Sequence, residues 1–263
     1  MLLARWGRLS RAAALLALAA VLLATASGCG DDDDIEIAAA SSMRHVLPRI
    51  VEEFLRAHPD LDVSFELRFN GSQVLATQIA EGASADLFIS ANAVQAERLI
   101  DEGTGSLPTV VTANRLVLAV REESRWYSLS DLADGDARIA VGSPSVPVGR
   151  LTVIALSLID RQVARELLAG VVTEDPSVRV VLSRLELDEA DAAFVYHSDV
   201  AVTHGLRALP LPPTVPPNEY VAVLLEDAKP GTEEFLAFLL TPEVQDLFRA
   251  AGFLRAVAGV RAQ

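Results

Sequence analysis

The sequence predicts an α/β protein made of two similar units with a ligand cleft between them. Two observations predict the units: strand and helix patterns alternate over residues 35–91, and a second alternation begins at residue 114. The third observation is a Pro-rich stretch over 209–220, which is typical of an extended connector and precedes one more strand pattern. With 263 residues, the chain can form one large domain or two small ones.

The first unit opens with the apolar run IEIAAA, which predicts a short strand. In chain order its predicted elements are a strand over 35–40, a helix covering 47–55, a strand over 63–69, a helix over 73–81 and a strand over 85–91. Ser41 or Ser42 is expected to cap the first helix, and Pro48 is best accommodated near its first turn. This alternation predicts a parallel sheet with covering helices.

The second unit repeats the alternation and is followed by a return to strand. Its predicted elements are strands over 114–120, 138–144 and 192–196, and helices over 148–159, 161–169 and 176–185. After the Pro-rich connector, YVAVLLED predicts a strand, and the remaining sequence supplies two closing helices with Gly252 as a stop signal.

An export signal precedes both units. Basic residues come before the apolar run AAALLALAAVLLATA, which ends in SGC at residues 27–29 and is too short for a transmembrane helix. The single cysteine, Cys29, lies where a bacterial lipoprotein signal places its lipidated residue, although Ala26 stands where Leu is preferred. We predict a lipoprotein signal peptide over 1–29, an acidic spacer over 30–34, and a lipid-anchored protein in the periplasm or on the outer face of the cell membrane.

Composition argues against several classes of partner. The net charge of −14 argues against nucleic acid, whose binding needs clustered Lys and Arg. A single cysteine provides no internal disulfide framework. The four histidines show no metal-ligand spacing, so we predict neither a bound metal cation nor a cofactor.

Several predicted helices begin directly after strands with residues that offer neutral hydrogen-bond donors. Ser42 and Ser72 open two helices of the first unit, and Val148 follows Pro147 at a helix start of the second. In DPSVR, Asp175 is a plausible N-cap with Val178 just inside the helix, and Tyr196 ends a strand. A single Ser or Asp before a helix usually serves only as a cap, but the carboxyl ends of strands are where open α/β sheets bind ligands.

Hydroxyls and helix amides without a basic partner favour one class of ligand. Helix N-termini carry partial positive charge, so these donors can hold a fully ionised oxyanion, and they offer no strong acceptor for an anion that keeps a proton. The pattern therefore predicts a tetrahedral dianion. Arg150 lies near Val148, and for this arginine we expect a surface ion pair rather than contact with the ligand.

Five segments resemble the molybdate-binding proteins of bacterial ABC transporters: IEIAAASSM, FNGSQVLATQIAEGASADLFISAN, SVPVGR, SVR and FVYHSDV. The resemblance covers residues 35–253, and its second segment is long and specific. It implies a two-lobed, type II periplasmic-binding-protein fold, each lobe a mainly parallel sheet flanked by helices, with the ligand in the interlobe cleft. Lobe 1 would comprise 35–113 and 218–263, and lobe 2 would comprise 114–217.

The resemblance also implies a role for single residues. Ser42 and Ser72 match the two ligand serines of the family, Val148 and Val178 stand where the family offers backbone amides, and Tyr196 matches its hydroxyl donor.

The chain departs from the family pattern at Pro48, at Ser41 in place of an alanine, and at Leu151 and Thr152, where Tyr-Ala is common. These departures affect the fine shape of the expected pocket.

The expected function is an exported, monomeric receptor that captures molybdate, and also tungstate, and delivers it to an ABC permease. It is not expected to be an enzyme. Two alternatives stay open: a sensor or another oxyanion-binding protein of the same fold, and an exported hydrolase. The hydrolase is less favoured because no G-x-S-x-G motif occurs and the histidines have no evident nucleophile partner.

Overall fold

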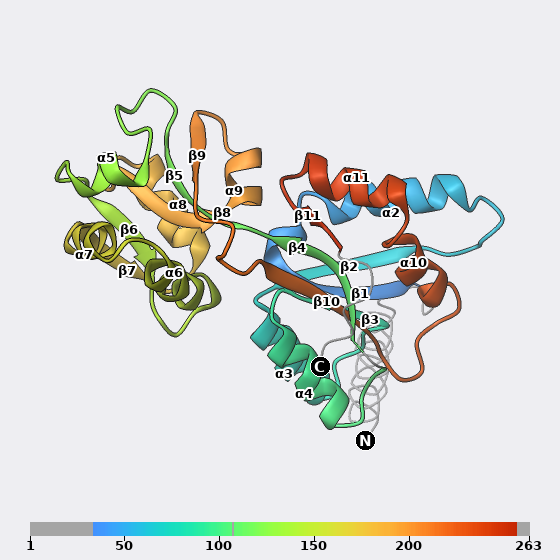
Figure 1. The fold of residues 1–263 in the computed structure, drawn as a ribbon. Helices are drawn as coiled ribbons and strands as arrows, with labels where there is room; N and C mark the ends of the chain where they lie inside the picture. The colour runs from blue at the N-terminus through green and yellow to red at the C-terminus, as the bar shows by residue number, and fades with distance from the viewer. Residues whose placement is uncertain (1–33, 107, 257–263) are drawn as a thin grey trace, which may run out of the picture. The chain divides into compact units, whose positions relative to one another are not determined.

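Two β-sheets, each packed against helices on both faces, form the core of the structure (Figure 1). The computed structural model describes residues 34–106 and 108–256, and those from Ile35 onward belong to one compact unit. The predicted signal peptide, Cys29 and all of the acidic spacer except Asp34 lie outside the described residues. None of the helices within the described ranges is long and apolar enough to cross a membrane.

The first sheet contains six strands in the order β11-β4-β10-β3-β1-β2. They are β1 (Ile35–Ala40), β2 (Phe65–Asn70), β3 (Leu87–Ser90), β4 (Thr109–Asn114), β10 (Asn218–Leu224) and β11 (Leu254–Arg255). Strand β1 pairs in parallel with β2 and β3, whereas β10 pairs antiparallel with β3 and β4, and β11 pairs antiparallel with β4.

The second sheet contains five strands in the order β7-β6-β8-β5-β9. They are β5 (Leu116–Arg121), β6 (Ile139–Gly142), β7 (Val171–Asp175), β8 (Ala192–Tyr196) and β9 (Leu206–Pro210). Strand β6 pairs in parallel with β7 and β8, and β5 pairs antiparallel with β8 and β9.

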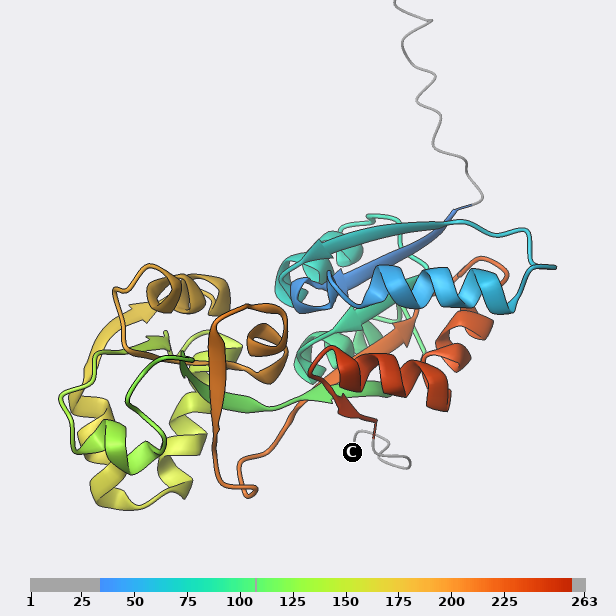
Figure 2. The ribbon, with the colours of Figure 1, turned by 90° about the horizontal axis from the view of Figure 1, so that it is seen from above.

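Both sheets are therefore mixed, with fewer parallel pairings than the mainly parallel sheets that the sequence predicted. Strand β4 ends at Asn114 and β5 begins at Leu116, so the chain passes almost directly from the first sheet to the second (Figures 1 and 2). The predicted strand over 114–120 corresponds to β5, the second strand of this crossing. Strand β10 brings the chain back. Two consecutive strands of one sheet can pair in parallel only if a crossover segment connects them. A strand that enters from the other sheet does not have this connection, so it can pair antiparallel with its neighbours.

Helices pack on opposite faces of the first sheet, and the alternation of β1 decides which residues they cover. Its side chains Ile37 and Ala39 join the cluster of α2, α10 and α11, whereas Ala38 joins the cluster of α3 and α4. Figure 1 shows these two groups of helices on opposite sides of the sheet. The helices of this half are the short 3₁₀ helix η1 (Ser41–Met43), α2 (Leu47–Ala57), α3 (Ser72–Ala80), α4 (Ala93–Asp101), α10 (Thr232–Phe238) and α11 (Pro242–Ala250).

The second sheet is covered in the same way, with one cluster under α5, α6 and α7 and another under α8. Its helices are α5 (Leu129–Ala133), α6 (Pro147–Leu158), α7 (Arg161–Ala169), α8 (Val178–Glu186) and α9 (His197–Val202). The sequence analysis did not identify α4, α5, α9, β4, β7, β9 or β11. Of these, α5 and α9 are only five and six residues long, which is too short for a helical repeat of apolar positions to be recognised.

Pro48 lies in the first turn of α2, as the sequence predicted. Proline has no N–H group and its ring clashes with the carbonyl four residues earlier, which here belongs to Arg44. The helix therefore cannot run continuously from Ser41, and the chain forms η1, a turn and then α2. This break separates Ser42 from the long helix and leaves it at the carboxyl end of β1.

Candidate functional site

One cavity of about 450 Å³ is lined by all five residues predicted to bind the ligand. They are Ser42, Ser72, Val148, Val178 and Tyr196. Their positions are in η1, at the starts of α3, α6 and α8, and at the end of β8, so both sheets contribute to the cavity.

Ser72 is the first residue of α3 and has its hydroxyl oxygen held in place. Gly71 precedes it in an extended conformation, so the chain turns directly from β2 into the helix. The Ser72 Oγ accepts a hydrogen bond from the Ala91 N–H at 3.0 Å. Because this bond uses only a lone pair, the hydroxyl proton can still be donated to a ligand.

Ser42 is paired with a tyrosine that the sequence analysis missed. The Ser42 Oγ lies 2.7 Å from the Tyr220 Oη, and Tyr220 is completely buried. Burial raises the pKa of Tyr220 to about 12, so its phenol stays protonated at neutral pH. When Tyr220 donates to Ser42, the Ser42 proton is free for the cavity, which Tyr220 also lines. A Tyr at a strand start is usually a packing residue, so sequence alone gave no signal for this role.

The amides of Val148 and Val178 lie before the hydrogen-bonded part of their helices. In α6 the Arg150 N–H bonds to the Val146 carbonyl at 3.0 Å, and in α8 the Val180 N–H bonds to the Ser177 carbonyl at 3.1 Å. The amides of Val148 and Val178 have no hydrogen bond within the described part of the chain, as expected at helix N-termini. Neither first turn contains an acidic residue, so both ends keep their partial positive charge.

Tyr196 has a buried hydroxyl without a hydrogen-bond partner in the described residues. Burial raises the pKa of this phenol well above its ordinary value, so the group is a donor and not a phenolate. A buried polar group without a partner costs about 1–3 kcal/mol. Because the hydroxyl lines the cavity, an acceptor that enters the cavity can supply the missing hydrogen bond.

Two sequence-based expectations about neighbouring charges were wrong. Asp175 does not cap α8, because Ser177 accepts the Val180 N–H, and the buried Asp175 carboxylate instead pairs with Arg184 at 3.0 Å. A residue before a Pro is held in an extended conformation, so β7 continues through Asp175 and the cap moves past Pro176. Arg150 makes no ion pair within the described residues, and it lines the cavity.

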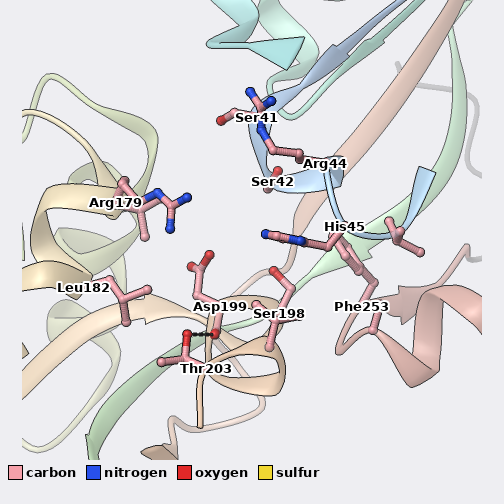
Figure 3. A pocket seen from close by; sticks show the side chains of 14 residues that line it. Ser41, Ser42, Arg44, His45, Arg179, Leu182, Ser198, Asp199, Thr203 and Phe253 are labelled. Carbon is pink, nitrogen blue, oxygen red and sulfur yellow. Dashed lines mark hydrogen bonds between the residues drawn. The ribbon is translucent and has the colours of Figure 1, made fainter. Parts of the chain in front are cut away.

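A second cavity, of about 270 Å³, is shown in Figure 3. It adjoins the first cavity, since Ser41, Ser42 and Val178 line both. The carboxylate of Asp199 points into it, with Arg179 and His45 on its other sides (Figure 3). Burial raises the pKa of Asp199 to about 6, although a hydrogen bond of 3.0 Å from the Tyr196 N–H and the charge of Arg179 act in the opposite direction. Asp199 therefore fixes the backbone of Tyr196 beside the first cavity.

The described residues contain no group of three or more His, Cys, Asp or Glu side chains that could hold a metal ion. The first cavity, of about 450 Å³, is also free of carboxylates. The donors in it are hydroxyls and amides, and its one charged side chain is Arg150. Such a donor set suits an anion and not a cation.

Residues 35–254 match the model of the bacterial extracellular solute-binding protein family. The chain is 30% identical over 230 residues to the molybdate-binding protein ModA of Mycobacterium tuberculosis, covering 84% of each protein. It is 31% identical over 231 residues to the putative ABC transporter substrate-binding lipoprotein YvgL of Bacillus subtilis, covering 83% of this chain and 85% of that protein.

A solved structure shares the fold. The substrate-binding domain of a putative molybdenum ABC transporter from Clostridium difficile superimposes with a TM-score of 0.74 at 26% identity, covering 85% of this chain and 99% of that one. The prediction of a two-lobed α/β binding-protein fold is thereby confirmed, with mixed sheets in both lobes.

Proposed function

Since the chain belongs to the bacterial extracellular solute-binding protein family, we propose that it captures molybdate outside the cytoplasm and delivers it to an ABC importer. The family consists of binding proteins, in agreement with the expectation that the chain is not an enzyme. Tungstate has the same charge and shape and nearly the same size as molybdate, so the proposal includes it as a second ligand.

The observation that carries this proposal is the unpartnered Tyr196 hydroxyl in a cavity of neutral donors. We assign the oxyanion contacts to the hydroxyls of Ser42, Ser72 and Tyr196 and to the amides of Val148 and Val178. Uncharged donors can satisfy a fully ionised tetrahedral anion, because each contributes a charge-assisted hydrogen bond. No carboxylate in the cavity lining accepts a proton from the ligand, which disfavours monohydrogen phosphate.

A calorimetric comparison of four tetrahedral anions tests the function. We expect tight binding of molybdate and tungstate and weak binding of sulfate and phosphate. Sulfate has the same charge and shape but is smaller, so it leaves donors of one lobe too far away. Equal affinity for all four anions would contradict selection by size, and preference for sulfate would identify a different receptor of the same fold.

Replacement of Tyr196 by Phe should weaken binding without a loss of stability. The variant loses a charge-assisted hydrogen bond to the ligand, so molybdate affinity should fall by about 1.5–3 kcal/mol. The stability of the ligand-free protein should change little, because the hydroxyl has no hydrogen bond to another described residue. Thermal unfolding with and without molybdate measures both effects. A less stable ligand-free variant with unchanged affinity would remove Tyr196 from the site.

We propose that lobe 1 comprises 35–113 and 218–263 and lobe 2 comprises 114–217, and that ligand binding favours the arrangement in which donors of both lobes reach the anion. A ligand shifts a conformational equilibrium only through its preference for one state. Donors on both lobes provide such a preference, and the closed form would then be the one that engages the permease.

For the location of the protein we propose a lipid anchor on Cys29, with residues 1–29 acting as the signal. The position of the single cysteine after an apolar leader supports this, and the relative from Bacillus subtilis is described as a lipoprotein. Replacement of Cys29 by Ala should move the exported protein from the membrane fraction to the soluble fraction, because a protein without the lipid chains loses its attachment. Unchanged membrane association would contradict the anchor.

A further inference from the structure

Arg150 is the one charged side chain that lines the first cavity, of about 450 Å³, within the described part of the chain. It is the fourth residue of α6, two positions after Val148, and it is exposed. It also lines a neighbouring cavity of about 500 Å³ together with Asn218 and Glu219. Arg150 therefore lies where the ligand cavity opens toward solvent.

The fold gives no reason for a cation at this position. Three arginines that lie near the second sheet are paired with carboxylates: Arg121 and Arg138 with Asp188 and Asp191, and Arg184 with Asp175. The Arg150 guanidinium has no hydrogen bond or ion pair to another described residue. Near a helix N-terminus a cation is unfavourable, because the helix dipole already places partial positive charge there. The charge is therefore available to a ligand.

The field of Arg150 extends into the ligand cavity as far as the Tyr196 phenol. Burial is the main cause of the raised pKa of Tyr196, and the positive charge of Arg150 acts against it and lowers the pKa. Tyr196 is proposed to hold the oxyanion, so an anion at that hydroxyl feels the same positive charge. This connection does not require direct contact between Arg150 and the ligand.

A positive charge at the cavity also acts against the negative charge of the rest of the chain. A protein with a net charge of −14 repels an approaching anion, and the helix amides and hydroxyls of the cavity are neutral. Neutral donors and helix N-termini carry only partial charges, so a whole positive charge adds to their preference for a dianion over a monoanion. A fixed charge distinguishes them, because its Coulomb attraction is proportional to the charge of the ligand.

We propose that Arg150 is the charge-selecting residue of this site: it attracts tetrahedral dianions into the cavity and favours them over monoanions of the same shape. The proposal rests on the proposed oxyanion-binding function and adds a residue to it. The neutral donors select size and shape, and Arg150 strengthens their selection of charge.

The test compares molybdate with perrhenate, a tetrahedral monoanion of nearly the same size. Calorimetry, with perrhenate measured by displacement of molybdate, is applied to the wild type, Arg150→Gln and Arg150→Lys. We expect Arg150→Gln to bind molybdate about tenfold less tightly, since charged steering contributes tenfold or more. Perrhenate should lose only about threefold, because half the charge gives half the free-energy change. Arg150→Lys keeps the charge and should stay close to the wild type.

Arg161→Gln is the matched control, because it changes the net charge equally at an exposed position of α7 outside the described cavities. It should leave both affinities unchanged. The loss in Arg150→Gln should also shrink as salt is raised from 20 to 300 mM, a range in which the Debye length falls from about 20 Å to about 6 Å.

Two results would overturn the inference: no change in Arg150→Gln, or an equal loss for both anions, which would indicate a role in shape and not in charge. A wild-type protein that binds neither anion would instead show that the proposed function itself is wrong.

Discussion

Replacement of Gly149 by Ala should destabilise the protein by about 3 kcal/mol or more and abolish tight anion binding. A methyl group at this position would lie 2.0 Å from the Ser143 carbonyl oxygen and 2.4 Å from that of Gly142. Both contacts are with backbone atoms, so no side chain can move aside. The first turn of α6 must shift away from β6, and it carries the Val148 amide with it.

The expected loss of binding follows from this shift. The Val148 N–H is proposed to donate to the anion, and a hydrogen bond to a charged group contributes about 1.5–3 kcal/mol only at correct geometry. Urea denaturation measures the loss of stability, and calorimetry with molybdate measures the loss of binding. Stability and affinity close to those of the wild type would show that the start of α6 is not fixed where the structure places it.

Gly71→Ala is the matched control at another helix start of the same cavity. Gly71 precedes Ser72, has a φ of −61°, and a methyl group there meets nothing within 4 Å. Alanine can adopt this conformation, so the change should stay within about 1 kcal/mol. A large loss in both variants would point to a general sensitivity of glycine positions and not to the close packing of Gly149.

The sequence predicted the chain segments that carry the site because each consists of a strand followed directly by a helix start. Ser72 and Val148 are examples: local patterns place both at helix N-termini, and the cavity brings those N-termini together. What the sequence could not predict are pairings between distant residues. The contact of Ser42 with Tyr220 joins positions 178 residues apart, and no local pattern distinguishes Tyr220 from a packing residue.

The mixed sheets were missed for a related reason. Local patterns identify strands but not their partners, and β4, β5 and β10 pair according to how the chain moves between the two sheets.

The cap of α8 illustrates competition between local signals. Asp175 and Ser177 can both cap a helix, and the ion pair of Asp175 with Arg184, nine residues away, contributes to the outcome.

Asp199 should make the wild-type protein less stable as pH rises, and Asp199→Asn should remove this dependence. Burial raises the pKa of Asp199 to about 6 from an ordinary 3.8, so between these values the native state binds the proton more strongly than the unfolded state does. The stabilisation is complete below about pH 3.8 and is lost as pH rises through about 6. The difference corresponds to at most about 3 kcal/mol, and water in the adjoining cavity reduces it.

The asparagine variant isolates the charge of Asp199. Its amide oxygen can still accept the Tyr196 N–H, so the end of β8 stays fixed, but no carboxylate has to ionise in the protein interior. Unfolding in urea at pH values from 4.5 to 7.5 should show a decline for the wild type that is smaller or absent in Asp199→Asn. At pH 7 the variant should be the more stable protein. A parallel decline in both would exclude Asp199 as the cause.

Asp191→Asn provides a control of opposite sign. The hydrogen bond from Arg138 lowers the pKa of Asp191, so the stability that this carboxylate contributes is present above its unfolded pKa and is lost only at lower pH. Between pH 4.5 and 7.5 the Asp191→Asn variant should lose a constant amount of stability. Its decline with pH should therefore parallel that of the wild type.

The negative charge of ionised Asp199 should also make the affinity for the anion depend on pH. Three basic side chains face Asp199 across its cavity: Arg179 from α8, and Arg44 and His45 from the turn before α2. The negative charge of Asp199 also raises the pKa values of the Tyr196 and Tyr220 phenols, so its potential reaches these hydroxyls. A negative potential that reaches these hydroxyls opposes a dianion in the first cavity, where the ligand is proposed to bind. Molybdate should therefore bind more tightly to the wild type at pH 5.5 than at pH 7.5.

Calorimetry at the two pH values separates Asp199 from its neighbours. The coupling is reciprocal: a bound dianion raises the pKa of Asp199, and a proton on Asp199 strengthens anion binding. Both effects correspond to the same coupling free energy. The pH effect should vanish in Asp199→Asn and persist in His45→Gln. If it vanished in His45→Gln and persisted in Asp199→Asn, the histidine that faces the carboxylate would be the coupled group. Asp199 would then act only through its hydrogen bond to the Tyr196 backbone.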